Sequence, residues 1–260
     1  MFSYDFQIAA GDKNTGTVYL PHEHSTNLPV IIYCHGWGGS RRLCAVAEKL
    51  LAQAAELNFA LVAFDFFACG DTGGDYGLMT YGRWKNNLAD IFSWCSNQSF
   101  ADPNKIGCYS VSSGTTAALR FAAENSKVAF VISVATAISS HIGMNQGGPA
   151  KIFADHAGEL LAGGKKELFG TMFGAEFFID NISNAPVHGM GKIQCPVLFL
   201  QGQSDGVSRR TDAFMGYELM KQNKLPATYF EIPGGNHGLD NVADEAADHI
   251  LNWLSAISLL

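Results

Sequence analysis

Residues 106–119 read Ile-Gly-Cys-Tyr-Ser-Val-Ser-Ser-Gly-Thr-Thr-Ala-Ala-Leu, an apolar run followed by small residues and then by an alanine-rich helical pattern. The stretch predicts a β-strand that ends at Tyr109 or Ser110 and turns tightly into a helix. A serine at such a turn presents its hydroxyl at the carboxyl edge of a sheet, and the N–H groups that follow point to the same place. Ser112 is therefore a candidate nucleophile.

The match to the nucleophile-turn pattern G-x-S-x-G is partial, because Ser110 replaces the first glycine while Gly114 supplies the last. Ser112 fits the central position, whereas Ser110 falls inside the predicted strand and Ser113 comes one residue late. Taken alone, the stretch favours an ordinary strand–helix junction. A nucleophilic serine also needs a base, and the rest of the chain has to supply it.

Two later segments each end a predicted strand with a residue that such chemistry needs. Residues 196–205 form an apolar run that ends in a Gly-containing turn with Asp205, and residues 229–238 end in a loop with His237. Each residue alone is accounted for by a local turn. Because the carboxyl ends of parallel strands gather at one sheet edge, Ser112, Asp205 and His237 together predict a catalytic triad.

A fourth strand end supports this prediction. Residues 30–41 are an apolar strand followed by His35-Gly-Trp-Gly-Gly39, a glycine-rich turn before a helix. Such a turn offers main-chain N–H donors for the oxyanion of a tetrahedral intermediate, and the N–H groups of Trp37 and Ser113 are the candidates. A plain strand–helix turn remains open as an alternative. A phosphate loop is disfavoured, because neither G-x-G-x-x-G nor G-K-[ST] is present.

The whole chain alternates strand-like and helical segments. Strands are predicted at residues 4–9, 15–20, 29–34, 60–66, 105–110, 129–135, 196–201 and 227–232, several of them apolar throughout. Helical faces are predicted from the spacing of Leu43, Val46, Leu50 and Ala54, and again near residues 242–257. We expect an α/β fold with a mostly parallel sheet of about eight strands, helices on both faces, and an antiparallel hairpin formed by the first two strands.

Residues 138–192 interrupt this alternation, and no strand is evident in them. They are rich in Gly, Ala and Phe. Two extra helices packed on the domain would account for the segment, but a cap over a pocket is favoured. We therefore expect a core domain of residues 1–137 and 193–260 and a cap at residues 138–192. The three histidines of the cap, His141, His156 and His188, are expected to lie at the surface.

Composition excludes several classes of protein. With 47% hydrophobic and 16% charged residues the chain is globular, and a net charge of −7 without a basic cluster argues against nucleic acid as a partner. No apolar run is long enough to span a membrane, and no basic residue precedes an apolar stretch at the N-terminus. The six cysteines form no CxxC pair, which favours reduced, buried thiols and a cytoplasmic location.

The chain resembles serine hydrolases of the α/β-hydrolase superfamily, most closely the small capped esterases similar to cinnamoyl and feruloyl esterases. The resemblance extends over residues 15–257, and its motifs are His35–Gly39, Phe64–Thr72, Asp102–Gly107 leading into Ser112, Asp205, and Asn236-His237-Gly238. Three positions depart from the family: Ser110, Thr115 after the turn, and Ala68-Cys69-Gly70 where Gly-His-Gly is usual.

From these residues and this resemblance we expect a carboxylic ester hydrolase that acts on small to medium apolar or aromatic acyl groups through an acyl-enzyme. Two alternatives stay open: an acyl-thioester hydrolase or acyltransferase, and an inactive ligand-binding protein on the same fold. A peptidase is disfavoured, because no acidic pair is evident to hold a peptide's amino end. The partner is a small-molecule ester, with no metal or cofactor, and a homodimer is an open possibility. The residues expected to contact substrate are His35, Gly36, Phe169 and Phe173.

Overall fold

The computed structural model describes residues 1–9, 11–139 and 148–260. Its central feature is an eight-stranded sheet in the order β1-β2-β4-β3-β5-β6-β9-β10. Strand β2 runs antiparallel to both of its neighbours, and the remaining pairs are parallel. The bounds of these strands are β1 Phe2–Gln7, β2 Thr15–Leu20, β3 Leu28–Cys34, β4 Ala60–Phe64, β5 Ala101–Val111, β6 Val131–Val134, β9 Val197–Gly202 and β10 Ala227–Ile232.

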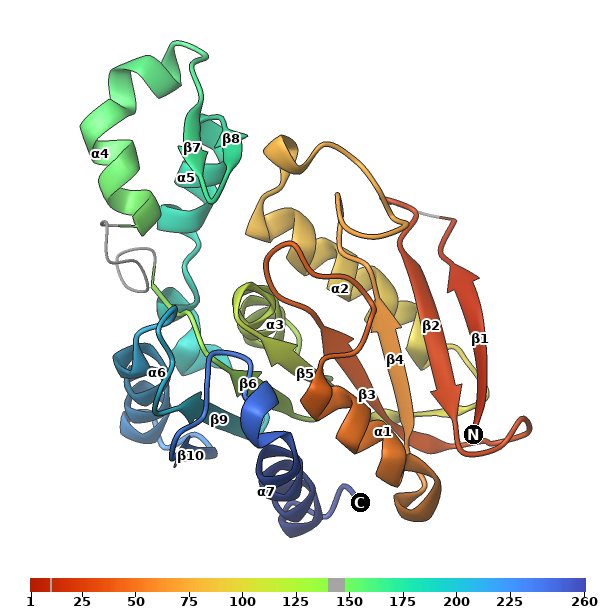
Figure 1. Cartoon of the computed structure of the whole chain (residues 1–260). Helices are drawn as coiled ribbons and strands as arrows, with labels where there is room; N and C mark the ends of the chain where they lie inside the picture. Colours follow the sequence, from red (N-terminus) through yellow and green to blue (C-terminus); the bar gives the residue numbers. More distant parts are fainter. Residues whose placement is uncertain (10, 140–147) are drawn as a thin grey trace.

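Helices cover both faces of the sheet, as the strand–helix alternation predicts (Figure 1). Helices α1 and α7 contribute buried side chains to one hydrophobic cluster, and helices α2, α3 and α6 contribute to another. The five helices are α1 Ala45–Leu57, α2 Tyr81–Ser96, α3 Ser113–Glu124, α6 Arg210–Gln222 and α7 Ala243–Ala256. The α/β-hydrolase fold expected from the sequence is therefore confirmed.

Strand β3 shows why its sequence is apolar throughout. Val30 and Ile32 face the cluster that contains α2 and α3, whereas Ile31 and Tyr33 face the cluster that contains α1 and α7. Successive side chains of a strand point to opposite faces, so a strand covered on both sides has no polar face to offer. This arrangement places the carboxyl end of the strand, and the loop after it, next to the neighbouring strand ends.

The predicted strands are all present, although some of their bounds differ. The largest difference is in β5, which begins at Ala101 rather than residue 105. Pairing of Leu28 with Ala101 extends this strand past Pro103, with a shift of register between Leu28 and Val30. In α1 the buried positions Val46, Leu50 and Ala54 are as predicted, but Leu43 lies before the helix begins.

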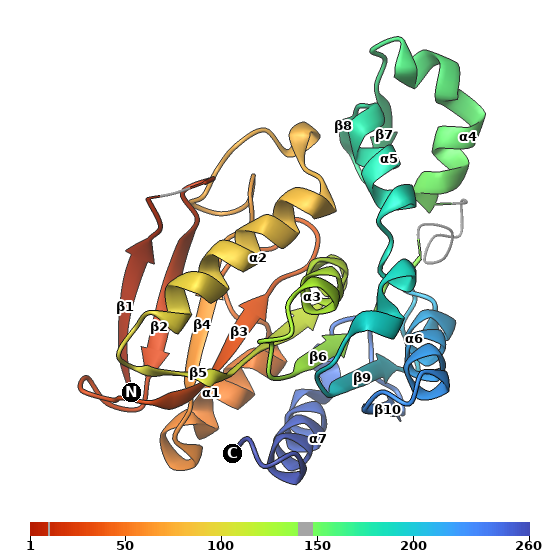
Figure 2. The same cartoon turned by 180° about the vertical axis from the view of Figure 1, so that it is seen from behind.

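The segment before β9 forms a separate group of elements beyond the sheet in both views (Figures 1 and 2). Its helices are α4 Gly148–Leu161 and α5 Ala175–Ser183, and between them lie the strands β7 Lys166–Leu168 and β8 Thr171–Phe173. The expectation that the segment contains no strand was wrong, because two strands of three residues, one with charged side chains, give no period-two pattern. His141 lies outside the described residues.

Short 3₁₀ turns complete the described chain at Tyr76–Leu78, Pro186–His188, Met190–Lys192 and Asp240–Val242. All six cysteines are free thiols, and all but Cys44 are buried, in agreement with the expectation of reduced side chains. No helix in the described ranges has the length and apolar character needed to cross a membrane.

Candidate active site

The turn between β5 and α3 holds Ser112 in an unusual backbone conformation. Its φ of 53° and ψ of −122° are disfavoured for any residue with a Cβ, at a cost of about 1–3 kcal/mol. The Ser112 N–H donates to the carbonyl of Val134 (2.9 Å), and the Thr115 hydroxyl donates to the Ser112 carbonyl (2.6 Å). The chain thus holds a strained serine at the carboxyl edge of the sheet.

The three adjacent serines have different environments. Ser110 lies within β5 and is fully buried. The hydroxyl of Ser113, the first residue of α3, lies 3.2 Å from the hydroxyl of Tyr81, which donates to it. Ser112 alone occupies the turn, which is the central position predicted from the sequence.

Glycine is required where the turn approaches the end of β3. A Cβ on Gly114 would lie 2.4 Å from the carbonyl oxygen of Cys34 and 2.5 Å from that of His35. A Cβ on Gly36 would lie 3.2 Å from the Ser112 Cβ. Since these contacts are with main chain or with Ser112 itself, the glycines allow the loop after β3 to pack directly against the nucleophile turn.

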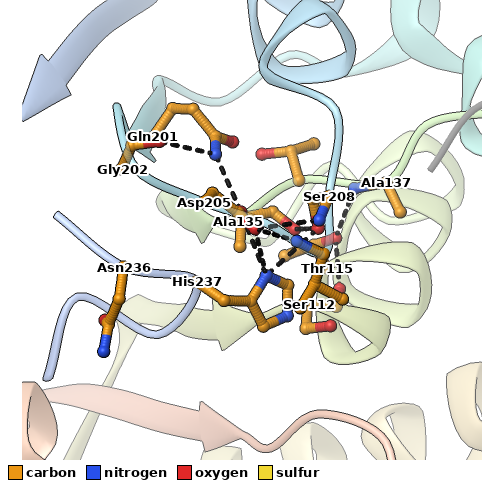
Figure 3. Close-up of polar contacts among 12 residues, drawn as sticks. Ser112, Thr115, Ala135, Ala137, Gln201, Gly202, Asp205, Ser208, Asn236 and His237 are labelled. Carbon is orange, nitrogen blue, oxygen red and sulfur yellow. Dashed lines mark hydrogen bonds and ion pairs between the residues drawn. The ribbon is translucent and has the colours of Figure 1, made fainter. Parts of the chain in front are cut away.

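Asp205 and His237 meet at the same edge, from the loops after β9 and β10. His237 Nδ1 lies 3.1 Å from Asp205 Oδ1 and 3.0 Å from Oδ2. A carboxylate only accepts, so Nδ1 carries the proton and Nε2 is left as an acceptor. In Figure 3 the His237 ring lies between Asp205 and Ser112, and Ser112 and His237 line the same cavity.

Three further donors surround the Asp205 carboxylate, whose side chain is fully buried. Gln201 Nε2 donates to Oδ2 (2.9 Å), and the N–H groups of Val207 and Ser208 donate to Oδ1 (2.8 and 2.9 Å). Burial by itself raises the pKa of Asp205, but the hydrogen bonds from His237, Val207 and Gln201 outweigh it, so the pKa is lowered. The carboxylate is ionised and fixed in direction.

A cavity of about 730 Å³ opens at this edge and is lined by several of the predicted residues. Ser112 and His237 lie on its wall. Most of the remaining wall comes from the loops after β3, β9 and β10 and from the turn between β7 and β8. The lining residues are Gly36, Trp37, Cys44, Val111, Ser112, Ser113, Phe169, Ser204, Gly206, Val207, Asn236, His237, Gly238 and Asp240.

The two predicted oxyanion donors lie on this wall, beside Ser112. In the described part of the chain, neither the Trp37 N–H nor the Ser113 N–H is bonded to a protein acceptor. Ser113 N–H belongs to the first turn of α3, where the helix dipole also favours negative charge. The arrangement can therefore hold an anionic oxygen at the nucleophile.

Two residues expected to contact substrate do not line the cavity. His35 is 1% exposed; its Nδ1 donates to the Gly36 carbonyl (2.8 Å), and its Nε2 accepts from the Phe66 N–H (3.2 Å). Burial lowers the pKa of His35 to about 4, against the opposing effect of the Gly36 carbonyl, so the ring is neutral and braces the loop after β3. Phe173 is fully buried behind the wall, stacked on Phe177.

Four residues around the site were not identified from the sequence. Gln201 and Ser208 support Asp205 and His237; the Ser208 hydroxyl lies 3.3 Å from both the Ala135 carbonyl and His237 Nδ1. Thr115, noted only as a departure from the family, binds the Ser112 carbonyl, and Asp240 lines the cavity. The spacing offers a signal for Ser208: it follows Asp205 by three residues, and in a turn that begins with aspartate the N–H at this position lies near the carboxylate.

Within the described residues, no group of three His, Cys, Asp or Glu side chains is placed to hold a metal ion. One carboxylate near the site, Asp65, has structural partners instead. Asp65, in the Phe64–Thr72 motif, accepts from the N–H groups of Arg41 (2.6 Å) and Asp71 (2.9 Å). The bond from Arg41 joins the loop after β3 to the loop after β4, and the bond from Asp71 lies within the loop after β4.

The parallel sheet, the strained serine turn and the meeting of loops from β5, β9 and β10 define an α/β-hydrolase. More than half of the chain, residues 11–164, matches the family described as X-Pro dipeptidyl-peptidase (S15 family), and the chain belongs to that family. Membership indicates a serine hydrolase. The matched residues include Ser112 but end before Asp205 and His237.

Two curated proteins are similar in sequence. An uncharacterized 31.7 kDa protein of the traX-finO intergenic region of Escherichia coli is 28% identical over 106 residues, which are 40% of this chain and 36% of that protein. The match therefore covers well under two thirds of that relative. The quorum-quenching protein AidA of Acinetobacter baumannii (strain MDR-ZJ06) is 26% identical over 78% of this chain and 79% of its own length.

Solved structures confirm the fold. The α/β hydrolase GrgF from Penicillium sp. sh18 has a TM-score of 0.75 and 17% identity, and covers 99% of this chain and 98% of its own. The ferulic acid complex of Est1E from Butyrivibrio proteoclasticus has a TM-score of 0.71 and 15% identity, with 94% and 96% coverage. At such low sequence identity these structures show that the fold is shared, and nothing about activity.

Proposed function

We propose that the protein cleaves carboxylic esters through an acyl-enzyme, with Ser112 as nucleophile, His237 as general acid–base and Asp205 as the group that orients the imidazole. The observation that carries the proposal is the Asp205–His237 hydrogen bond of 3.0 Å, which turns the second ring nitrogen toward the strained Ser112. The proton on Nδ1 leaves Nε2 able to accept the serine proton.

The chemistry follows from these positions. Ser112 Oγ bonds to the acyl carbon while its proton passes to His237 Nε2, and the carbonyl oxygen becomes an oxyanion next to the N–H groups of Trp37 and Ser113. Collapse breaks the ester C–O bond, and His237 returns the proton to the departing alcohol. Water, deprotonated by His237, then attacks the acyl-enzyme and releases the acid.

The acyl group that this site accepts is apolar or aromatic. Trp37 and Phe169 line the cavity, and their rings meet edge to face with centroids 5.4 Å apart. Pockets lined in this way bind hydrophobic groups. In this proposal residues 138–192 act as a cap, because they supply Phe169 to the cavity wall.

The test is removal of the nucleophile. Ser112→Ala is expected to lower hydrolysis of p-nitrophenyl butyrate by at least about a thousandfold and to abolish labelling by a fluorophosphonate probe. Ser113→Ala keeps its main-chain N–H, so the probe still labels it. Ser93→Ala, an exposed serine on α2, keeps full turnover. Undiminished turnover by Ser112→Ala would overturn the proposal.

Family membership favours a second candidate, an Xaa-Pro dipeptidyl peptidase that uses the same three residues. An amide anion is a much poorer leaving group than an alkoxide, so amide cleavage depends more strictly on protonation by His237. A dipeptidyl peptidase must also hold a free amino end. Comparing kcat/KM for Xaa-Pro p-nitroanilides and for p-nitrophenyl esters separates the two candidates. The same panel extended with thioesters tests the acyl-thioester alternative, and a wild-type protein that no probe labels would favour a ligand-binding role.

A further inference from the structure

The wall of the catalytic cavity differs in character from one side to the other. Trp37 and Phe169 present rings, whereas the loop after β10 presents Asn236, Gly238 and Asp240. The inference drawn here rests on the proposed ester hydrolysis. In that reaction His237 must reach the departing oxygen, so the alcohol half of the ester lies on the loop that carries His237.

Asp240 is fixed on that same loop. Its N–H donates to Asn236 Oδ1 (3.0 Å), and the Asn236 N–H donates to Asn241 Oδ1 (2.9 Å). The amide of Asn241 in turn donates to the Gly234 carbonyl (2.9 Å). These side-chain bonds join Gly234, Asn236, Asp240 and Asn241 across the loop, and so restrict the movement of Asp240 relative to His237.

Asp240 lines the same cavity as Ser112 and His237. A Cβ built on Gly238, the residue after His237, would lie 2.6 Å from Asp240 Oδ2. The other oxygen, Oδ1, accepts from the Ala45 N–H at the start of α1 (3.3 Å). One oxygen is thus held by main chain, and the side chain remains exposed at the cavity wall.

No opposite charge compensates Asp240 at this wall. The lining residues include neither lysine nor arginine, and among the described residues Asp240 forms no ion pair with a basic side chain. The ion pair one turn further along, Lys49 with Asp244, joins two exposed side chains outside the cavity. A departing alcohol next to His237 therefore meets an uncompensated negative charge.

We propose that Asp240 selects the leaving group by its charge: esters of cationic alcohols are favoured, neutral ones are accepted, and anionic ones are rejected. A like charge brought to a site without a counter-ion is disfavoured, and an opposite charge is attracted in both ground and transition state. Thioesters whose thiol carries phosphate groups are among the rejected substrates. This charge discrimination favours small oxygen esters over nucleotide-bearing thioesters.

Three butyrate esters of similar size test the proposal: the choline ester, the uncharged 3,3-dimethylbutyl ester and the anionic 2-sulfoethyl ester. For the wild-type protein at low salt we expect kcat/KM to fall about five- to tenfold from the cationic to the neutral ester, and again to the anionic ester. In Asp240→Asn, which keeps the acceptor for Ala45 N–H, both ratios are expected to approach one. Raising the salt to about 0.5 M shrinks the wild-type ratios.

The matched control is Asp244→Asn, which removes the same charge from a side chain that is 81% exposed and outside the cavity. It is expected to keep the wild-type ratios. Ratios that Asp240→Asn leaves unchanged, or a wild-type protein that does not distinguish the three esters, would overturn the role of Asp240 and leave ester hydrolysis standing. A wild-type protein that hydrolyses none of the three esters, nor p-nitrophenyl butyrate, overturns both proposals.

Discussion

The Ser110 hydroxyl donates a hydrogen bond of 2.8 Å to the main-chain carbonyl oxygen of Ile132, on the neighbouring strand β6. Ser110 occupies the position at which the usual nucleophile turn has glycine. Its side chain is fully buried and satisfied within the sheet, so it does not enter the cavity. The serine is therefore compatible with the close packing that normally requires glycine at this point.

Replacing Ser110 tests this interpretation. Ser110→Ala removes the hydroxyl and its bond to Ile132, which is expected to lower the free energy of unfolding by about 1 kcal/mol. Because the side chain is bonded to Ile132 and does not line the cavity, fluorophosphonate labelling is expected to persist. Urea unfolding and labelling of the same sample check both statements. Loss of labelling at unchanged stability would show that Ser110 has a direct part in the chemistry.

Gly114 is expected to tolerate no side chain. A Cβ there would meet two main-chain carbonyl oxygens at 2.4 and 2.5 Å, and main chain cannot move aside as a flexible side chain can. We expect Gly114→Ala to destabilise the protein by about 1–3 kcal/mol and to displace the turn that carries Ser112, with loss of activity. Thermal unfolding and p-nitrophenyl butyrate hydrolysis provide the two measurements.

The comparison for this variant is Gly158→Ala, in the last turn of α4 and after the non-helical residue His156. No heavy atom lies within 4 Å of a Cβ at Gly158, and alanine is favoured over glycine in a helix by about 1 kcal/mol. The two glycine-to-alanine changes are thus expected to shift the melting temperature in opposite directions. Equal destabilisation by both would contradict the explanation from close packing.

The sequence predicts the sheet well, because a strand covered on both faces has to be apolar throughout, as β3 and β4 are. The early hairpin is confirmed by the pairing of Phe2 with Leu20. The turn between β7 and β8 was not predictable in this way. Its form depends on Phe169 and Gly170, which both have positive φ, and a phenylalanine in that conformation gives no signal in the sequence.

For the site, the residue types and their places at strand ends were readable, since the chemistry itself requires a serine, a base and an acid. The side chains that hold these catalytic residues in position could not be identified from the sequence. Nothing in the sequence distinguishes Gln201 from other strand residues, and only the folded structure shows that its amide donates to Asp205. His35 was misjudged because a histidine next to a glycine-rich turn has the same sequence whether it faces substrate or is buried against Phe66. Only the packing distinguishes these cases.

Phe169 is expected to lower the stability of the folded protein, because its backbone is strained, while its ring helps to bind the acyl group of the substrate. It occupies the first position of a two-residue hairpin turn at φ 50°, where asparagine is preferred and a bulky side chain is strained. Its ring is nevertheless 58% exposed and lies against Trp37. We expect Phe169→Asn to raise the melting temperature while lowering kcat/KM for p-nitrophenyl esters of long or aromatic acids relative to the acetate.

Met172, on the adjoining strand, provides the control for Phe169. It is 48% exposed but does not line the cavity. Met172→Asn is expected to leave the preference among acyl groups unaltered. A Phe169→Asn protein with a lower melting temperature, or with an unaltered acyl preference, would show that the ring is a structural contact of the hairpin rather than a contact to substrate.

Asp212, in the first turn of α6, is expected to make stability depend on pH near neutrality. The residue is 1% exposed, and its Oδ2 accepts from the Ile138 N–H (3.2 Å). Burial raises the pKa of Asp212 from 3.8 to about 7, although the N–H groups of Ile138 and Ser139 and the charge of Arg209 oppose the shift. The folded protein therefore holds this proton more tightly than the unfolded chain does.

A pKa that is raised on folding lowers stability as the pH rises from 3.8 toward about 7, after which the contribution is constant. Asp212→Asn removes the titration and keeps an acceptor for Ile138. Its melting temperature is therefore expected to fall less than that of the wild-type protein between about pH 5 and about pH 8. Asp155→Asn, which alters an exposed carboxylate paired with Lys151, is expected to behave like the wild type in this respect. If Asp212→Asn and the wild type lose the same stability over that range, the buried carboxylate is ionised throughout and the charge of Arg209 outweighs its burial.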